Sequence, residues 1–279
     1  MPVIAVVNRK GGSGKSTFAA HVAAWCARAG HAVMLGDIDR QQSSRAWLRR
    51  RPAELPAIAP WAMDQNTLRV PTGISHVVLD TPGGLQGFEL ARVVMFADAI
   101  VMPVCASMFD RESAALCHAE LQALPRVANG RCRVGVVAMR IDGRTNGAEV
   151  MRQWAEAIGM PFLGVLRETQ VYTRTLERGL TIFDVNPAQV ATDLAQWQSV
   201  LQWLEPVIAP PQAANDGPLT RAPIATRIAS ARPDNLMPAQ ESLVHGTRLT
   251  GLSSTRVEHR AVAGTLAGSR TQVPQFLKR

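Results

Sequence analysis

Lysine is almost absent from this sequence. Of its 30 basic residues, 27 are arginine and only three, Lys10, Lys15 and Lys278, are lysine. No lysine lies between residues 16 and 277, which excludes the N-K-x-D and T-K-x-D elements by which many proteins read guanine. The first 206 residues keep just two lysines, five positions apart. This bias suggests a task at those two positions that suits a compact ammonium better than a planar guanidinium.

Long apolar runs and paired cysteines are also missing. No stretch of 18 apolar residues occurs, so we expect no transmembrane helix. The first residues, "MPVIAVVNRK", are typical of a buried strand and not of a secretory signal. The four cysteines show no C-x-x-C spacing, which argues against a zinc site or a disulfide framework and fits a reducing cytoplasm.

Positive charge is concentrated in the C-terminal quarter. The net charge is +8, and residues 207–279 carry nine basic and four acidic residues, which leaves +3 for residues 1–206. The C-terminal stretch is rich in Pro, Ala and Arg without a sustained hydrophobic period. We therefore expect a folded domain over residues 1–206 and a disordered basic tail over residues 207–279. The charge favours a polyanionic partner, either nucleic acid or anionic lipid.

Short apolar runs alternate with helical patterns through residue 206. Strands are predicted at 3–7, 32–39, 76–82, 99–104, 133–139 and 162–166, and helices at 15–29, 42–51, 86–97, 108–124, 145–158 and 187–205. This alternation is typical of an α/β fold, with a doubly wound, mostly parallel sheet covered by helices on both faces. Ligands of such sheets bind at the carboxyl ends of the strands, where Asp37, Asp39 and Asp80 fall.

The segment "NRKGGSGKST", from Asn8 to Thr17, links the first strand to the first helix. It matches the phosphate-binding pattern G-x-x-x-x-G-K-[ST] except that Arg9 replaces the first glycine. Backbone amides and the helix dipole should converge here on the phosphates of a nucleotide, whose base we take to be adenine. The residues expected to hold it are Gly11, Gly12, Ser13, Gly14, Lys15, Ser16 and Thr17.

Three side chains around this loop have an expected role with phosphate and metal. Lys15 should contact the β- and γ-phosphates, and Ser16 should ligate Mg²⁺. Asp80 follows an apolar strand and should complete the outer shell of the metal.

Lys10 has no clear task in its own subunit, because Lys15 already serves the phosphates. It could instead reach a nucleotide held by another copy of the chain, so that the site is complete only in a dimer. A cation supplied in trans neutralises charge that develops during phosphoryl transfer, as an arginine finger does. A solvated lysine beside the loop is the alternative.

The motif "KGGSGKST" resembles the deviant Walker A box of the ParA/MinD family of positioning ATPases, which are P-loop NTPases. "VMLGDIDRQQSS" resembles the family's D-x-D-P-Q motif and "VVLDTPGG" its Walker B strand, while "VVAMRIDGRT" and "GVLRETQVYTRTLERGLTIFDV" resemble its later segments. The resemblance covers residues 1–206. Arg9 and Arg40 depart from it, since the family often has Gln and usually Pro at those positions. The short spacing from Asp39 to Asp80 resembles a compact, orphan-type ParA.

This resemblance implies an ATPase that uses ATP and Mg²⁺, releases ADP and phosphate, and forms an ATP-dependent homodimer. By position, Lys10 matches the family's trans lysine and Asp39 the residue that orients the attacking water. Asp37 matches either a structural or a metal-side carboxylate, and Asp80 matches the Walker B aspartate. In the two later segments, Arg140 and Arg167 are expected to contact the nucleotide.

Family members use ATP to bind a large surface, which is nucleoid DNA for ParA-like members and membrane for MinD-like members. We expect a cytoplasmic, nucleoid-associated protein that binds non-specific DNA through phosphate contacts. The candidate DNA contacts are Arg144, Arg152, Arg174 and Arg178.

The resemblance also implies cargo and a regulator. Expected partners are a plasmid, chromosome or protein cargo and a ParB-like or cargo adaptor protein that stimulates hydrolysis. Membrane binding is less favoured because Pro274 interrupts the C-terminal segment "TQVPQFLKR". Two further candidate functions are a DNA-transfer factor of the VirC1 type and a small-molecule ligase of the dethiobiotin-synthetase type.

Overall fold

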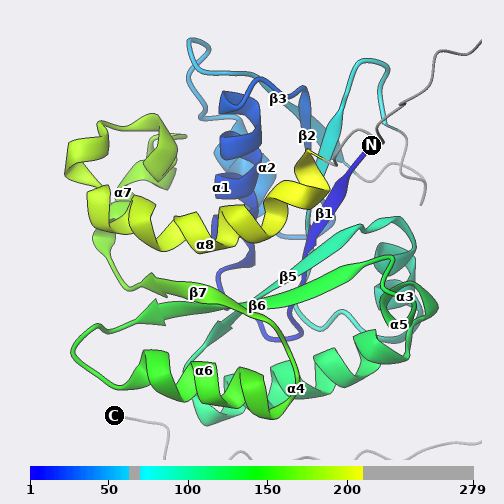
Figure 1. Ribbon diagram of the computed structural model, residues 1–279. Coiled ribbons are helices and arrows are strands. Elements are labelled where there is room, and N and C mark those ends of the chain that lie inside the picture. Colours follow the sequence, from blue (N-terminus) through cyan, green and yellow to red (C-terminus); the bar gives the residue numbers. More distant parts are fainter. Residues whose placement is uncertain (63–69, 210–279) are drawn as a thin grey trace, which may run out of the picture. The chain divides into compact units, whose positions relative to one another are not determined.

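Seven parallel strands form one sheet in the computed structural model, which describes residues 1–62 and 70–209 (Figure 1). The strands are β1 (Val3–Val6), β2 (Val33–Asp37), β3 (Ile58–Ala62), β4 (His76–Asp80), β5 (Ala99–Cys105), β6 (Arg133–Ile141) and β7 (Phe162–Arg167). Their spatial order is β3-β2-β4-β1-β5-β6-β7. The first four strands form one half of the sheet, in which β4 lies between β2 and β1, and β5, β6 and β7 extend the other half. This confirms the predicted doubly wound α/β fold.

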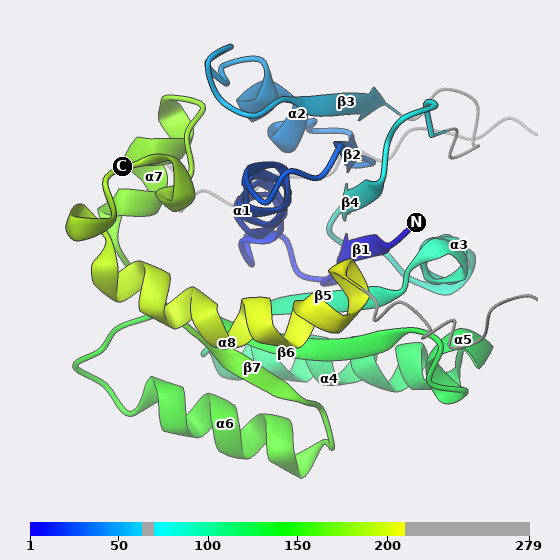
Figure 2. The ribbon, with the colours of Figure 1, turned by 45° about the horizontal axis from the view of Figure 1, so that its top comes forward.

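Helices cover both faces of the sheet (Figures 1 and 2). One face carries α1 (Lys15–Arg28), α2 (Ser43–Leu48), α7 (Gln170–Glu177) and α8 (Ala191–Ile208), together with the 3₁₀ turns η1 (Ile182–Asp184) and η2 (Pro187–Gln189). The other face carries α3 (Gly87–Phe96), α4 (Met108–Ala123), α5 (Pro125–Ala128) and α6 (Gly147–Ala157).

The central strands β1 and β5 are apolar at every position because both of their faces are buried. In β1, Ile4 and Val6 join the core beneath α1 and α8, whereas Val3 and Ala5 join the core beneath α3 and α4. Successive side chains of a strand point to opposite faces, so each core receives every second residue. The carboxyl ends of β1, β2 and β4 are thereby held at one edge, where the candidate residues lie.

The sequence patterns missed β3 and α7. β3 contains Pro60, which has no backbone N–H to donate, but β3 pairs with β2 at the edge of the sheet, where a missing donor is tolerated. α7 has eight residues and is capped at its N-terminus by Thr169, whose hydroxyl accepts from the Val171 amide. Its length was too short for a clear helical period.

The last helix runs past the expected domain boundary at residue 206. α8 continues to Ile208, which is buried in the core and whose carbonyl lies 2.9 Å from His76 Nε2. The expected tail lies outside the described residues from residue 210 onward.

His21 lies fully buried where α1 meets the C-terminal helices. Its Nδ1 lies 2.7 Å from the Thr17 carbonyl, and its Nε2 accepts from the Ile182 amide at 3.3 Å. The ring stacks on Trp197 with a centroid separation of 5.4 Å. One nitrogen must donate and the other must accept, so the neutral ring fits these partners, and burial lowers the pKa of His21 to about 4.

Replacing His21 with Gln should change how the free energy of unfolding depends on pH. The unfolded chain takes up a proton near pH 6.5, whereas folded His21 resists protonation until about pH 4. Stability should therefore fall as the pH drops through this window, by about 3 kcal/mol for this group. Urea unfolding between pH 7 and pH 4 checks this. The difference in free energy of unfolding between wild type and H21Q should become smaller as the pH falls from 7 to 4. A difference that stays constant would contradict a folded His21 that is neutral with a lowered pKa.

Candidate nucleotide-binding site

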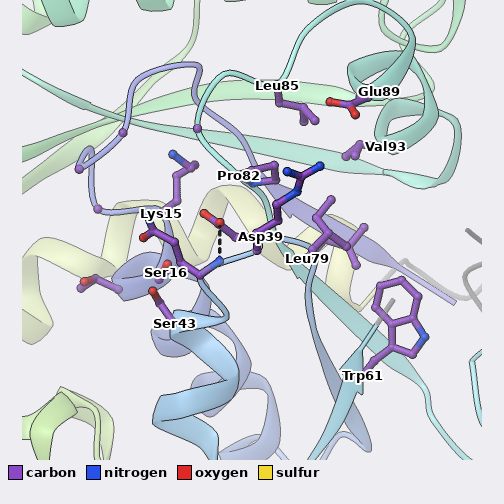
Figure 3. Close-up of a pocket in the computed structure, with 18 of the residues that line it drawn as sticks. Lys15, Ser16, Asp39, Ser43, Trp61, Leu79, Pro82, Leu85, Glu89 and Val93 are labelled. Atoms are coloured by element: carbon purple, nitrogen blue, oxygen red, sulfur yellow. Dashed lines mark hydrogen bonds between the residues drawn. The ribbon is translucent and has the colours of Figure 1, made fainter. Parts of the chain in front are cut away.

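A cavity of about 860 Å³ opens at the carboxyl ends of β1, β2 and β4 (Figure 3). Lys15, Ser16 and Asp39 lie at one end of it, and Trp61 lies at the other. Its described lining includes Gly11, Gly12, Gly14, Lys15, Ser16, Thr17, Ile38, Asp39, Arg40, Trp61, Leu79, Pro82, Glu89, Val93, Phe96 and Arg140. Six of the seven loop residues predicted to hold the nucleotide line this space. Ser13, the seventh, is buried beside it, and its hydroxyl has no partner within the described chain.

The loop before α1 has the shape of a phosphate cradle. Gly14 precedes α1 with a φ of 96°, a left-handed conformation that favours glycine and turns the chain into the helix. The Lys15 ammonium donates to the Lys10 carbonyl at 3.0 Å and so closes the loop on itself. Burial lowers the pKa of Lys15. The first amides of α1 supply hydrogen-bond donors for an anion, and the Lys15 ammonium supplies positive charge.

Asp80 is the most deeply buried carboxylate of the site. Its Oδ2 accepts from Ser44 Oγ at 2.5 Å, while its Oδ1 is buried with no partner among the described residues. Burial raises the pKa of Asp80 to about 6, although hydrogen bonds from Ser44 and Ser16 oppose the shift. An unsatisfied buried carboxylate oxygen beside a Ser16 hydroxyl fits a magnesium site.

The oxygen atoms at this site suit Mg²⁺ better than they suit a metal ion whose ligands all come from protein side chains. In the described residues, no three His, Cys, Asp or Glu side chains gather as a metal cage. Mg²⁺ usually keeps waters and uses few protein ligands together with substrate phosphates. Ser16 would be such a ligand, and Asp80 would hold the ion's water shell.

Asp37 and Asp39 face different surroundings. Asp37 is buried, and its two oxygens accept from the backbone amides of Asp39 and Arg45 at 3.1 and 3.0 Å. The sequence left two roles open for Asp37, a structural one and a metal-side one. These bonds favour the structural role, because they fix the turn between β2 and α2. Asp39 lines the cavity, and its Oδ1 accepts from the Gln41 amide at 2.9 Å.

Lys10 lies on the shoulder of the loop. Its ammonium is 3.3 Å from Asp110 Oδ1 and 5.9 Å from the centroid of the Phe109 ring, and its side chain is 38% exposed. Asp110 in turn is fixed at the start of α4 by the Ser107 hydroxyl. Lys10 is not among the described residues that line the cavity.

The arginines predicted to contact nucleotide or DNA lie in different surroundings. Arg140 lines the cavity in a left-handed conformation, with a φ of 55°. Arg167 does not line it among the described residues; its guanidinium instead donates to Asp193 at 2.8 and 2.9 Å. The four arginines proposed for DNA are exposed and lie on α6, on α7 and on the segments flanking them. Arg144 and Arg152 are ion-paired.

Sequence reasoning missed two side chains that touch the site. Ser44 binds Asp80 across the sheet edge, and Asp110 holds Lys10. The serines of "DRQQSS" were a weak signal for Ser44. Nothing in the sequence pointed to Asp110, because its proximity to Lys10 depends on β5 lying beside β1.

Comparison with known proteins agrees with this geometry. The family described as CobQ/CobB/MinD/ParA nucleotide binding domain matches residues 4–182. A maintenance of carboxysome distribution protein A from Gloeobacter kilaueensis is 34% identical over 212 residues, which cover 73% of this chain and 94% of that protein. The chromosome-partitioning ATPase Soj of Thermus thermophilus is 32% identical over 178 residues, covering 51% and 70%.

Solved structures agree on the fold. A variant of Cyanothece McdA in complex with ATP superposes with a TM-score of 0.57 at 14% identity, and the match covers 72% of this chain and 96% of that one.

Replacing Asp80 with Asn should stabilise the free protein while weakening its response to nucleotide. Above about pH 6 folded Asp80 carries a buried charge that destabilises the fold, so the neutral amide should raise the free energy of unfolding at pH 8 by about 3 kcal/mol. This gain should vanish near pH 4, where folded Asp80 is itself neutral. Urea unfolding at both pH values measures it.

The same D80N variant should gain less stability from ATP with Mg²⁺ than the wild type does. An equal gain in both proteins would argue against Asp80 as the carboxylate beside the metal.

Proposed function

Because the chain belongs to the CobQ/CobB/MinD/ParA family of nucleotide-binding domains and is a P-loop ATPase, we propose that it is a ParA-like positioning ATPase. In this proposal, ATP and Mg²⁺ bring two copies together, and the dimer binds non-specific DNA. A ParB-like or cargo adaptor protein then stimulates hydrolysis and releases the dimer. The cargo is a plasmid, a chromosome or a protein assembly.

The placement of Lys10 is the observation that carries the proposal. A lysine meant for its own nucleotide would point into the cavity, as Lys15 does. Lys10 instead points to the subunit surface, where Asp110 holds its ammonium at 3.3 Å. A partly exposed cation at the mouth of a phosphate site is placed to reach a second copy that faces it.

Each remaining side chain of the site has a chemical task in this proposal. The loop amides and Lys15 bind and neutralise the phosphates. Ser16 and Asp80 would hold Mg²⁺, which supplies further neutralisation of phosphate charge. Asp39, which lines the cavity at its polar end, would hold a water in line with the γ-phosphate.

The surface that the dimer binds is proposed to be DNA. The chain's net charge of +8 suits a polyanion, and Soj is named as a chromosome-partitioning ATPase. Among the helices of the described residues, none combines the length and apolar character that crossing a membrane requires. The C-terminal segment considered for a membrane anchor lies outside the described residues.

Replacing Lys10 with Ala should separate nucleotide binding from dimerisation. ATP should still bind, because Lys15 and the loop amides remain, but the ATP-dependent dimer should be lost because its cross-subunit contact is gone. Light scattering after size exclusion, with ATP and Mg²⁺, measures the mass, and a fluorescent ATP analogue measures binding. A K10A protein that still dimerises with ATP would refute the role in trans.

Replacing Asp39 with Ala should slow hydrolysis without preventing assembly. Loss of the group that positions water should lower the turnover rate by roughly 100-fold, within the usual range for general base catalysis. The ATP-bound dimer should then persist on DNA. Phosphate release and DNA co-sedimentation check both effects, and ordinary turnover in D39A would assign the water to another residue.

A further inference from the structure

We infer that DNA phosphates bind a basic surface built by α2 and α7, an inference that rests on the proposed DNA-binding function. This surface, the α2–α7 patch, consists of Arg49, Arg50, Arg174 and Arg178. Arg174 and Arg178 were already expected from the sequence to contact DNA. Arg49 and Arg50, which directly follow α2, take the place of Arg144 and Arg152.

The two halves of the patch are far apart in the sequence but adjacent in space. Gly179 lies so close to Arg50 that a Cβ at position 179 would collide with the Arg50 carbonyl. Trp47 Nε1, near the end of α2, donates to the Leu180 carbonyl at 3.3 Å. The segment after α2 therefore runs beside the segment after α7 (Figure 2). Arg178 directly precedes the glycine at this crossing.

An ion pair beneath the patch holds these segments together. The Arg51 guanidinium donates to Asp184 at 2.9 and 3.2 Å, and the side chain of Asp184 is buried. Arg51 is thus used in the fold, whereas Arg49 and Arg50 beside it are exposed. One nitrogen of Arg50 donates to the Ala46 carbonyl at 2.7 Å, a bond that leaves its charge unpaired. A fixed backbone under exposed arginines reduces the entropy lost when a phosphate binds.

The patch carries uncompensated positive charge. Arg49, Arg50, Arg174 and Arg178 are all exposed, and none forms an ion pair with an acidic residue in ranges 1–62 and 70–209. Arg174 and Arg178 are four residues apart, so they lie on the same side of the helical turn. Glu177 is the acidic residue between them, and four arginines leave the patch net positive.

Arg144 and Arg152 are exposed but neutralised. Arg144 is 2.6 Å from Asp142, and Arg152 is 2.7 Å from Glu149. A phosphate that approached either arginine would meet the paired carboxylate as well. These two arginines are consequently poor phosphate ligands, and they form a matched control because they are the same residue type at exposed positions.

The patch is also joined to the nucleotide site through α2. Ser44, in the first turn of α2, donates to Asp80, and the next amide, of Arg45, donates to Asp37. Arg49 follows the last residue of the same six-residue helix. One end of α2 thus contacts the candidate metal site, and the other end supplies half of the patch.

The test compares two double variants of the full chain, R49A/R50A and R144A/R152A. Binding to a fluorescent DNA duplex of arbitrary sequence is measured by anisotropy with ATP and Mg²⁺ over a series of salt concentrations. R49A/R50A should weaken binding about tenfold and lower the salt slope by about 0.9 for each phosphate that the variant no longer neutralises. R144A/R152A should bind as wild type does. Arg49→Lys with Arg50→Lys should restore binding, since lysine also contacts phosphate.

Several results would overturn the inference. Equal weakening in both double variants would mean that only total charge matters, and weakening confined to R144A/R152A would place the DNA on α6. If wild type bound vesicles of anionic lipid through Arg49 and Arg50 but not DNA, the partner class would be wrong. If wild type bound no DNA with ATP, the proposed function itself would fail. Unchanged ATP binding and thermal unfolding in R49A/R50A confirm that the variant is folded.

Discussion

The hydrogen bond from the Lys15 ammonium to the Lys10 carbonyl is the contact on which the site depends. It closes the loop between β1 and α1, and six of the seven residues from Gly11 to Thr17 line the cavity beside it. It also places the two lysines in opposite surroundings. Lys15 is buried where it lines the cavity, while Lys10 lies at the surface beside Asp110. In the proposed function, this closed loop supplies the phosphate cradle, and Lys10 stays at the surface as the cation for a second copy.

α2 is the element through which this cradle can act at a distance. Its first turn is held by the carboxylates of Asp37 and Asp80, and its far end packs against the segment that follows α7. Both carboxylates are buried, and burial raises the pKa of each, so the approach of a cation or a proton stabilises them. A short helix therefore connects the carboxylates of the candidate site to the exposed arginines that follow it.

The sequence predicted the fold, and it pointed to the loop that lines the cavity, because both depend on local patterns. Apolar runs of strand length and the loop from Asn8 to Thr17 can be read without knowledge of tertiary contacts. The edge strand β3 and the short α7 could not, since pairing and packing stabilise them more than propensity does. Asp110, Ser44 and the ion pairs of Arg144 and Arg152 depend on which side chains meet, and one sequence without its fold does not contain that information.

A structure of the chain with a non-hydrolysable ATP analogue and Mg²⁺ tests the central claim most directly. We expect two subunits face to face, with each Lys10 ammonium released from Asp110 and hydrogen-bonded to a phosphate in the opposite subunit. A single subunit with bound nucleotide, and with Lys10 still paired to its own Asp110, would contradict the account.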